Sequence, residues 1–492
     1  MLIYDYIIVG AGPAGLALAQ CCSRNGEKVL IIEKEEKLGG CHGVKRVKYK
    51  KNDGSTELIF TEHGPRIYSD TYSVFNKLLK EMNVDFYKLF KKYRFNIFEI
   101  GGQTILSVLS NKEIGLLLLQ FFYLSLDNTY GESINLYEYL IKNKFSDNSL
   151  EMIDRICKLS DGGGHHKFTL NKFLQLMNQQ LLYSLYQPRQ PNDIGLFKIW
   201  YKFLTSRNVE FLFNSTIQNI ITDVTTNTIE FVTIKEKGKE QSYNAYTKNL
   251  ILAIPPKSLY NFLINQNELI KNSFGNSLKE FSEENAYIEY ISITFHWDTI
   301  LKLKKIYGFP KTSWGVAFVL LTDYMTFNES TSQTVISAAI TLTDKISPNT
   351  MKTANECTKE ELIIEVFNQL KSAYGNDLIT PTLSILSPDV SYDETKKIWV
   401  SSNTAFIASN KYKPLPFKSS IIPNLYTLGT HNGNSLYKFT SLEAAVSNAV
   451  VLGNLFNNKK EGEISCTIYI SDILHVIYCI ILIYLIYRLF YN

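Results

Sequence analysis

The chain has 492 residues, which is too long for one compact hydrophobic core and predicts two or more lobes. The 51 Lys and Arg residues nearly balance the 47 Asp and Glu residues, giving a net charge of +4. Because no dense basic stripe carries interleaved aromatic residues, we expect no nucleic-acid-binding surface.

The chain opens on an apolar strand over residues 5–9, which leads through a glycine-rich turn into an Ala- and Leu-rich helix. The glycines follow GxGxxG spacing. Gly10 permits a tight turn, Gly12 lets backbone N–H groups reach a pyrophosphate, and Gly15 lets the helix pack closely on the sheet. The pattern predicts a dinucleotide site; a glycine-rich turn without a ligand is the alternative. The residues expected at the pyrophosphate are Gly10, Gly12, Pro13, Ala14 and Gly15.

A second strand, over residues 29–32, ends at Glu33. A carboxylate at this position of the motif accepts hydrogen bonds from ribose hydroxyls, so Glu33 is predicted to bind the cofactor. Because the first strand begins almost at Met1, we expect no signal peptide.

The paired glycines Gly39 and Gly40 follow this unit closely. Together with the string GAGPAGLALA, which begins at Gly10, and with Glu33, they resemble the FAD-binding N-terminus of the flavin amine oxidase superfamily. That superfamily includes monoamine oxidases, protoporphyrinogen oxidases and phytoene desaturases, and UDP-galactopyranose mutase is a more distant relative. The resemblance implies that FAD is the cofactor and that the backbone of the glycine pair lies against it.

Three later segments resemble the same family. Residues 209–220 resemble the strand whose backbone touches the adenine, with Ile217 at the usual valine position. Residues 249–256 resemble the strand that ends in Ala-x-Pro, and residues 424–430 resemble the strand-to-flavin turn. The resemblance therefore implies FAD contacts at Ile217 and Gly429.

A helix is expected soon after that turn. Thr440 and Glu443 have the spacing of a capping box, which marks a helix start independently of the resemblance. In the family, the N-terminal amides of this helix face the flavin pyrimidine, where a helix N-terminus stabilises the negative charge of reduced flavin. Glu443 is therefore predicted to lie at the cofactor; an ordinary capped surface helix is the alternative.

These landmarks predict an α/β fold with a discontinuous Rossmann-like FAD-binding domain and a substrate domain of mixed β-sheet plus helices. Strand-like runs occur over residues 286–297, 315–321 and 334–342, and helical patterns fit residues 78–82 and 360–373. The expected FAD-binding pieces are residues 1–85, 190–285 and 400–456, and the expected substrate-domain pieces are residues 86–189 and 286–399.

A polar cluster, His63-Gly64-Pro65-Arg66, matches the segment that passes the flavin in this superfamily. Protoporphyrinogen oxidases often have Gly-Pro-Arg there and the mutases have Gly-Pro-His, so the resemblance places Gly64 beside the cofactor. Arg66 is predicted to clamp a substrate carboxylate or the flavin itself; a solvated loop residue or a structural ion pair is the alternative. The predicted catalytic residues are Arg66, His63 and His431.

The sequence lacks residues that amine-oxidising members of the family use. The strand over residues 287–297 contains no counterpart of their lysine, and Ser441 stands where they have an aromatic residue. Residues 401–410 contain no cysteine to tether FAD, so we expect non-covalent FAD and do not predict an amine substrate. Cys41 stands where many relatives have an arginine. The seven cysteines show no metal-ligand spacing, which predicts reduced thiols and no metal site.

The C-terminal part differs in character from the rest of the chain. Residues 468–487 are strongly apolar with one charge, Asp472, and their length matches a bilayer-spanning helix. Residues 457–467 have the composition of a polar linker. We expect a single-pass C-terminal tail anchor in a membrane, with the catalytic domain on the cytosolic side and Asp472 near the interface. A buried core helix or a terminal strand is the alternative.

The sequence contains a single dinucleotide fingerprint, which leaves no second one for NAD(P)H and therefore favours an oxidase or dehydrogenase over an NAD(P)H-dependent reductase. The leading hypothesis is an FAD-dependent oxidoreductase that takes hydride from a small organic substrate, in this family often apolar, onto non-covalent FAD. A non-redox mutase resembling UDP-galactopyranose mutase is the first alternative, and a catalytically degenerate membrane-tethered flavoprotein is the second. The sequence indicates no oligomeric state.

Overall fold

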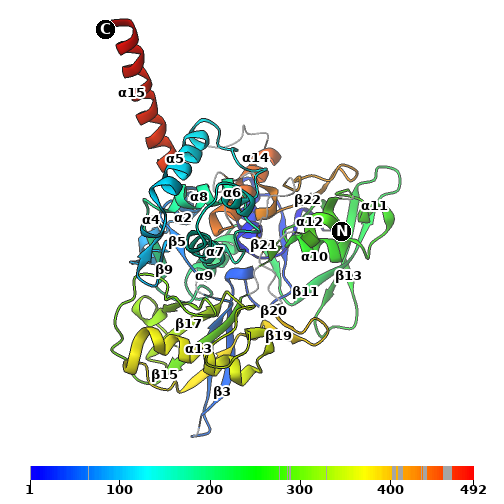
Figure 1. The fold of residues 1–492 in the computed structure, drawn as a ribbon. Helices are drawn as coiled ribbons and strands as arrows, with labels where there is room; N and C mark the ends of the chain where they lie inside the picture. Colours follow the sequence, from blue (N-terminus) through cyan, green and yellow to red (C-terminus); the bar gives the residue numbers. More distant parts are fainter. Residues whose placement is uncertain are drawn as a thin grey trace.

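The N-terminal strand of the computed structural model lies inside a seven-stranded sheet with the order β10-β2-β1-β13-β12-β11, and β22 pairs with β13 (Figure 1). The strands β10, β2, β1, β13 and β22 are parallel, so their carboxyl ends meet at one edge. β11 and β12 extend the sheet in antiparallel fashion. The bounds are β1 (Ile3–Val9), β2 (Val29–Ile32), β10 (Glu210–Leu212), β11 (Ser215–Thr222), β12 (Ile229–Glu236), β13 (Tyr243–Leu252) and β22 (Leu425–Thr427). The structure describes residues 2–51, 53–64, 66–275, 277–284, 286–287, 290–328, 330–401, 406–407, 414–433, 435, 440–457 and 468–491.

Helices cover both faces of this sheet. Ile8 of β1 lies in one core and its neighbour Ile7 lies in the other, because successive side chains of a strand point to opposite faces. Apolar residues on both faces explain why the strands are nearly continuous runs of Val, Ile and Leu. The first core is covered by α1 (Pro13–Cys22), α2 (Ser73–Glu81), α9 (Leu196–Ser206) and α14 (Leu442–Phe456), and the second by α10 (Pro256–Leu263), α11 (Glu268–Lys271) and α12 (Ser277–Glu284).

A second lobe contains a four-stranded antiparallel sheet with the order β16-β17-β15-β18 and one long helix, α13. A hairpin from the N-terminal part of the chain reaches this sheet, since Thr61 Oγ1 of β4 lies 3.0 Å from Thr294 Oγ1 of β15. The residues that follow β4 therefore lie between the two sheets. The bounds are β3 (Val44–Lys50), β4 (Thr56–Glu62), β15 (Ile291–Trp297), β16 (Ala317–Leu320), β17 (Thr334–Ile340), β18 (Leu383–Leu386) and α13 (Lys359–Tyr374).

A group of helices stands beside this sheet and shares a core with it. Phe173 of the helices and Val335 of the sheet belong to the same buried cluster. A small sheet, β5-β9-β6, joins this group to the rest of the chain. The bounds are α3 (Phe86–Leu89), α4 (Ile105–Val108), α5 (Asn111–Leu126), α6 (Leu136–Lys142), α7 (Asp147–Asp161), α8 (Leu170–Gln180), β5 (Tyr68–Ser69), β6 (Phe90–Tyr93) and β9 (Leu185–Pro188). The remaining short strands are β7 (Glu99–Ile100), β8 (Gln103–Thr104), β14 (Ala286–Tyr287), β19 (Val390–Asp393), β20 (Ile398–Ser401) and β21 (Phe406–Ile407).

The elements expected from the sequence are present, and so is the α/β fold class with a Rossmann-like sheet and a mixed second lobe. One strand differs from expectation. The run expected over residues 286–297 contains two strands, β14 and β15, which pair with different partners. The helices α5 to α8 had no predicted counterpart. The boundaries of the two domains stay a prediction.

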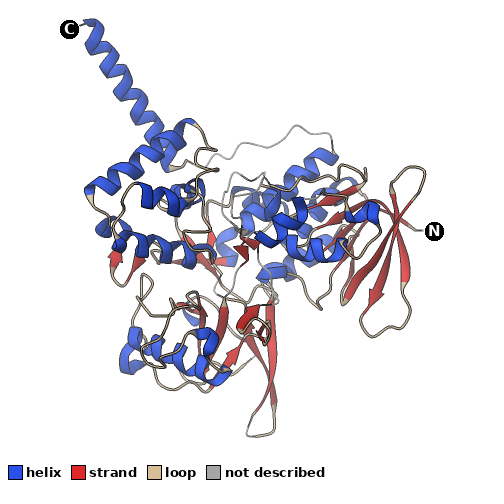
Figure 2. Ribbon diagram, turned by 45° about the vertical axis from the view of Figure 1, so that its right-hand side comes forward, coloured by secondary structure: helices blue, strands red, loops and turns tan. Residues whose placement is uncertain are grey.

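The C-terminal helix α15 (Ile470–Tyr491) projects from the body beyond α5 (Figures 1 and 2). Its 22 residues give a length of about 33 Å at 1.5 Å per residue, which is enough to cross a hydrocarbon core. Only 6% of the window Ile470–Tyr487 is buried, so both alternatives, a buried core helix and a terminal strand, are wrong. Within the described part of the chain, this is the one helix long and apolar enough to span a membrane. The expected linker lies outside the described residues except for Asn457.

Candidate functional site

The predicted cofactor residues come together at the carboxyl edge of the large sheet. Val9, the last residue of β1, pairs with Ile32 of β2 and with Leu252 of β13, and Leu252 pairs with Thr427 of β22. The glycine turn, Glu33 and the turn at Gly429 therefore leave neighbouring strands side by side. Ligands of open parallel sheets bind outside this edge.

The glycine turn is shaped by close backbone approach. Gly10 has a φ of +110°, and a Cβ there would lie 2.5 Å from the carbonyl oxygen of Ala253. A Cβ at Gly15 would collide with the carbonyl oxygen of Gly10. These two glycines are required by the fold itself, as the sequence predicted from the motif.

Gly12 and the glycine pair form a surface of bare backbone. A Cβ at Gly40 would lie 3.1 Å from the Cα of Gly12, and the N–H of Gly39 donates to the carbonyl oxygen of Ala11 at 3.0 Å. Helix α1 begins here with Pro13 in its first turn, and no described side chain accepts a hydrogen bond from its N-terminal amides. Those amides have no partner within the helix, so this end suits an anionic group.

Glu33 is buried at the end of β2 and ties the turn together. Its Oε2 accepts from the N–H of Ala11 at 2.7 Å, and its Oε1 accepts from the N–H of Glu35 at 2.9 Å. Burial raises the pKa of this carboxyl. Each carboxylate oxygen has a second lone pair, so these bonds leave acceptor capacity for a ribose hydroxyl.

The predicted adenine strand begins beside Glu33. The N–H of Ser215 donates to the carbonyl oxygen of Glu33 at 2.9 Å, which places the start of β11 next to the end of β2. The side chain of Ile217 is buried in the second core, and the β11–β12 register shifts directly after it, between Ile217 and Asn219. A contact of Ile217 with the adenine would therefore be made by its backbone.

Arg66 lies next to the glycine pair. Its guanidinium donates to the carbonyl oxygen of Cys41, the residue that follows Gly40. Arg66 is half-buried, and it forms no ion pair with a described carboxylate, so the alternative of a structural ion pair does not hold among these residues. Its positive charge stays available to a bound anion.

Two buried polar side chains accompany Arg66. His63 Nδ1 lies 3.2 Å from Ser401 Oγ, and neither His63 Nε2 nor Glu62 Oε1 has a hydrogen-bond partner in the described parts of the chain. Burial, assisted by Arg66, lowers the pKa of His63 to about 3. Burial raises the pKa of Glu62 to about 7, against the opposing effect of Arg66. Glu62 was not predicted, although it directly precedes the His-Gly-Pro-Arg cluster. Gly64 has a φ of +150° and lies near Ser292 and Tyr290 of the second lobe.

The turn after β22 is held by hydrogen bonds between its backbone and two asparagine side chains. The N–H of Gly429 donates to Asn432 Oδ1 at 2.8 Å, and its carbonyl oxygen accepts from Asn448 Nδ2 at 2.8 Å. Asn432 also donates to the carbonyl oxygen of Leu415 at 3.1 Å. The sequence did not indicate either asparagine. His431 is buried in this turn, and burial lowers its pKa to about 3.

Helix α14 begins one residue later than expected. The capping box of Thr440 and Glu443 is wrong, because Ser441 is the N-cap and its hydroxyl accepts from the N–H of Ala444 at 3.0 Å. Glu443 instead caps another helix, α2. Its two oxygens accept from the N–H groups of Val74 at 2.8 Å and Phe75 at 2.9 Å, and burial raises its pKa to about 7. A contact of Glu443 with the cofactor stays a prediction.

Comparison with known sequences gives a match to one family model and matches to two curated proteins. A family model described as an NAD(P)-binding Rossmann-like domain matches residues 8–82. UDP-galactopyranose mutase of Mycoplasma genitalium is 29% identical over 170 residues, which are 30% of this chain and 39% of that protein. UDP-galactopyranose mutase of Mycoplasma pneumoniae is 38% identical over 66 residues, which are 13% of this chain and 15% of that protein. The chain thus matches well under half the length of these curated relatives.

Solved structures match over nearly the whole chain. Putrescine oxidase bound to putrescine has a TM-score of 0.61 at 14% identity, with 93% of this chain and 100% of that chain covered. Cyclohexylamine oxidase from Brevibacterium oxydans has a TM-score of 0.56 at 12% identity, with 93% and 100% covered. The chain has the fold of the flavin amine oxidase superfamily. The Rossmann-like match and these relatives support the FAD expected from the sequence.

The residues at the strand ends of this flavin amine oxidase fold suit FAD. The uncapped end of α1 and the bare backbone at Gly12 and Gly40 suit its pyrophosphate, and Glu33 suits its ribose. The guanidinium of Arg66 reaches this surface at Cys41, and His63, three residues earlier in the chain, has an Nε2 without a hydrogen-bond partner among the described residues.

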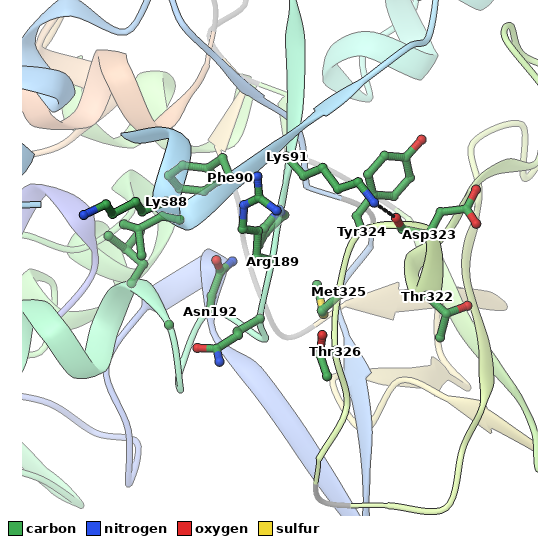
Figure 3. Close-up of a pocket in the computed structure, with 15 residues that line it drawn as sticks. Lys88, Phe90, Lys91, Arg189, Asn192, Thr322, Asp323, Tyr324, Met325 and Thr326 are labelled. Atoms are coloured by element: carbon green, nitrogen blue, oxygen red, sulfur yellow. Dashed lines mark hydrogen bonds between the residues drawn. The ribbon is translucent and has the colours of Figure 1, made fainter. Parts of the chain in front are cut away.

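A cavity of about 490 Å³ adjoins this surface and was not predicted (Figure 3). Asn192 lines it and also donates to the carbonyl oxygen of His42 at 3.5 Å. Figure 3 shows Lys88, Arg189 and Asn192 on one side of it and the segment Thr322–Thr326 on the other, with Lys91 extending across to the carbonyl oxygen of Asp323.

A second cavity, of about 350 Å³, shares Lys91, Asp323 and Tyr324 with the first. Seven basic side chains line the two cavities together, against one carboxylate, Asp323, although basic and acidic residues are nearly equal in the whole chain. None of the seven forms an ion pair with a carboxylate that the structure describes. They are Lys88, Lys91, Lys92, Arg94, Arg189, Lys304 and Lys305.

Proposed function

We propose that the protein is an FAD-dependent oxidoreductase that removes hydride from a small organic substrate. The observation that carries this proposal is the uncapped N-terminus of α1, which opens at the carboxyl edge of the sheet beside the bare backbone of Gly12 and Gly40. The flavin, when bound, accepts the hydride, so the chain supplies binding, orientation and electrostatics.

We assign the ADP half of FAD to residues from three strand ends. The amides of Ala14 and Gly15 bind the pyrophosphate, Glu33 accepts from the ribose, and the backbone at Ile217 meets the adenine. The turn at Gly429 leaves the same edge and directs the chain towards α14, whose N-terminal dipole favours negative charge.

We assign the substrate side to Arg66 and His63. Arg66 carries a positive charge without a described carboxylate partner, which suits a substrate carboxylate, a phosphate or the flavin. It also reaches the turn at Cys41, where many relatives have an arginine. With a pKa of about 3, His63 is neutral near pH 7, so its Nε2 orients a polar group without adding charge. His431 is the third candidate.

The test uses full-length protein reconstituted with FAD. We expect flavin absorbance, anaerobic bleaching by a reducing substrate and recovery when an acceptor such as O₂ is admitted. Panels of hydroxy acids, apolar alcohols and amines separate substrate classes, and amines are expected to fail because β15 has no lysine and Ser441 caps α14. Protein that stays colourless after reconstitution contradicts the proposal. A flavin that no substrate reduces favours the degenerate flavoprotein.

A second candidate function is a non-redox flavin-dependent mutase acting on a nucleotide-sugar. Two observations favour it: both curated relatives are UDP-galactopyranose mutases, and seven basic side chains that form no ion pair with a described carboxylate line the two adjoining cavities. Such a lining suits the phosphates of a nucleotide-sugar. Isomerisation of UDP-galactopyranose without O₂ consumption supports the mutase, whereas net flavin bleaching by an organic substrate supports the oxidoreductase.

We also propose that α15 is a tail anchor that leaves the body on the cytosolic side of a membrane. The support is its length and its exposed apolar surface. Deletion of residues 466–492 should move the protein from a carbonate-resistant membrane pellet to the soluble fraction. Truncated protein that stays in the pellet contradicts the anchor.

A further inference from the structure

Helix α5 carries an apolar stripe that faces away from the protein. Leu118, Leu119, Tyr123 and Leu126 are 48%, 46%, 40% and 60% exposed, and they recur at the spacing of one helix face. No charged residue occurs between Glu113 and the end of the helix. The opposite face is buried in the core of the helical group. A contiguous exposed apolar surface of this kind marks an interaction site rather than ordinary solvent exposure.

The stripe is continuous with the C-terminal helix. The rings of Phe122 of α5 and Tyr478 of α15 meet edge to face, with centroids 4.7 Å apart. Tyr478 lies eight residues after Ile470, the first residue of α15. At 1.5 Å per residue, α5 therefore meets α15 about 12 Å along the helix axis from its foot.

The foot of α15 is fixed on the body by hydrogen bonds. Asn178 of α8 donates to Ser471 Oγ at 3.0 Å, and its Oδ1 accepts from the N–H of Ser471 at 2.7 Å. Tyr183 also donates to the carbonyl oxygen of Ile468. Two exposed leucines, Leu181 and Leu182, precede Tyr183. The start of the candidate span is thus held in a defined position next to further apolar side chains.

We propose that α5 lies in the membrane as an interfacial helix, with its stripe among the acyl chains of the leaflet that α15 enters. This rests on the proposed tail anchor. If Ile470–Tyr487 spans the bilayer, a contact about 12 Å from the foot lies within one leaflet, because half of a hydrocarbon core is about 15 Å thick. Lipid is the occupant because the stripe runs without a break into the exposed surface of α15, which lipid covers.

This arrangement adds a second, in-plane membrane contact to the spanning helix. It fixes the orientation of the body at the surface: the helical group rests on the bilayer, and the second lobe, which lines one side of the cationic cavities, points away from it. Figures 1 and 2 show α15 leaving the molecule at the end opposite to the β15–β18 sheet.

The test measures tryptophan quenching by nitroxide-labelled lipids in phosphatidylcholine vesicles that carry the full chain. Leu119→Trp reports on the stripe, and Ile364→Trp is the matched control, because Ile364 is 60% exposed on α13 of the other lobe. Wild-type emission is subtracted; three of the four native tryptophans, Trp200, Trp297 and Trp314, are fully buried. Leu126→Trp repeats the measurement if Leu119→Trp does not fold.

We expect the added emission at position 119 to be blue-shifted and to fall by about half or more with labels on the acyl chains, and the emission at position 364 to be unaffected. Equal quenching at both positions, or none at position 119 in protein that floats with the vesicles, overturns the α5 proposal and leaves the anchor standing. A blue shift without quenching shows a second copy of the chain on the stripe and also overturns it. Failure of the wild-type protein to float overturns the anchor and the α5 proposal together.

Discussion

Two regions at the same edge of the large sheet differ in whether their buried polar groups have hydrogen-bond partners within the described protein. The first, from Gly10 to Arg66, leaves the amides of α1 uncapped and Glu62 Oε1 and His63 Nε2 without described partners. In the second, from Thr427 to Asn448, the side chains of Asn432 and Asn448 hydrogen-bond the backbone of the turn at Gly429. Ser441 caps α14, and Glu443 caps α2. Polar groups left without partners are costly to bury unless a ligand meets them. We therefore propose that the first region holds the ligand and that the second, in which Thr440 Oγ1 is the buried atom left without a described partner, mainly supports it.

The comparison is tested most strongly at Gly12. Gly12→Trp places a large side chain where the pyrophosphate is expected, so we expect loss of FAD retention with the fold kept, measured by flavin absorbance and circular dichroism. Gly12→Ala is the control, because its Cβ would lie 3.8 Å from the nearest atom, the Cα of Gly40. Yellow protein with an unchanged FAD content in the Gly12→Trp variant would show that the cofactor lies elsewhere.

Arg66 tests whether an unpaired charge in the first region serves substrate rather than cofactor. We expect Arg66→Ala to lower turnover by about tenfold or more while FAD occupancy stays near that of wild type, because the bidentate contact to an anionic group is lost. Arg66→Lys keeps the charge and should recover part of the turnover. Unaltered kinetics in Arg66→Ala would remove this residue from the site.

The two buried carboxyls sharpen the comparison through pH. The pKa of Glu62 is raised from 4.5 to about 7, so the unfolded chain ionises this group near pH 4.5 while the folded chain keeps it protonated. The stability it contributes at low pH is therefore lost as the pH rises from about 4.5 to 7. Glu62→Gln removes the ionisable group and so avoids this loss. As the pH rises from about 4.5 to 7, the free energy of unfolding of the variant should increase relative to that of wild type by up to about 3 kcal/mol, measured by urea denaturation.

Glu443→Gln is the matched comparison for Glu62→Gln. The pKa of Glu443 is raised to a similar value, but its oxygens accept hydrogen bonds from two backbone N–H groups. In Glu443→Gln, the side-chain NH₂ group would face one of these N–H groups, so two donors would meet without an acceptor. We expect Glu443→Gln to destabilise the protein at every pH. If both variants respond to pH in the same way, the distinction between the two regions fails.

The smallest expected effect is at Asn432. Asn432→Ala removes the acceptor for the N–H of Gly429 and the donor to the carbonyl oxygen of Leu415. We expect a loss of about 1–3 kcal/mol of folding free energy with FAD affinity nearly unchanged, measured by thermal unfolding of the apoprotein and by FAD titration. A loss of FAD affinity without a loss of stability would place this turn among the binding residues.

The first region was largely predictable because its rules are local. The spacing of Gly10, Gly12 and Gly15 reflects contacts between residues a few positions apart, and the strand over residues 29–32 matched β2. The cap of α14 was missed because Thr440 and Ser441 are both good N-caps, and the geometry of the preceding chain chose between them. The cationic cavities were missed because their lysines come from segments more than 200 residues apart.

By itself, the sequence determined the nucleotide-binding turn, the parallel strands around it and an apolar C-terminal helix of membrane-spanning length, since each follows from periodicity and spacing within about 30 residues. Only the tertiary structure decided that Glu443 serves α2, that Glu62 and His63 lie buried beside Arg66, and that α5 meets α15 at Tyr478. Those outcomes depend on which distant segments pack together, and no local pattern of residues records that choice.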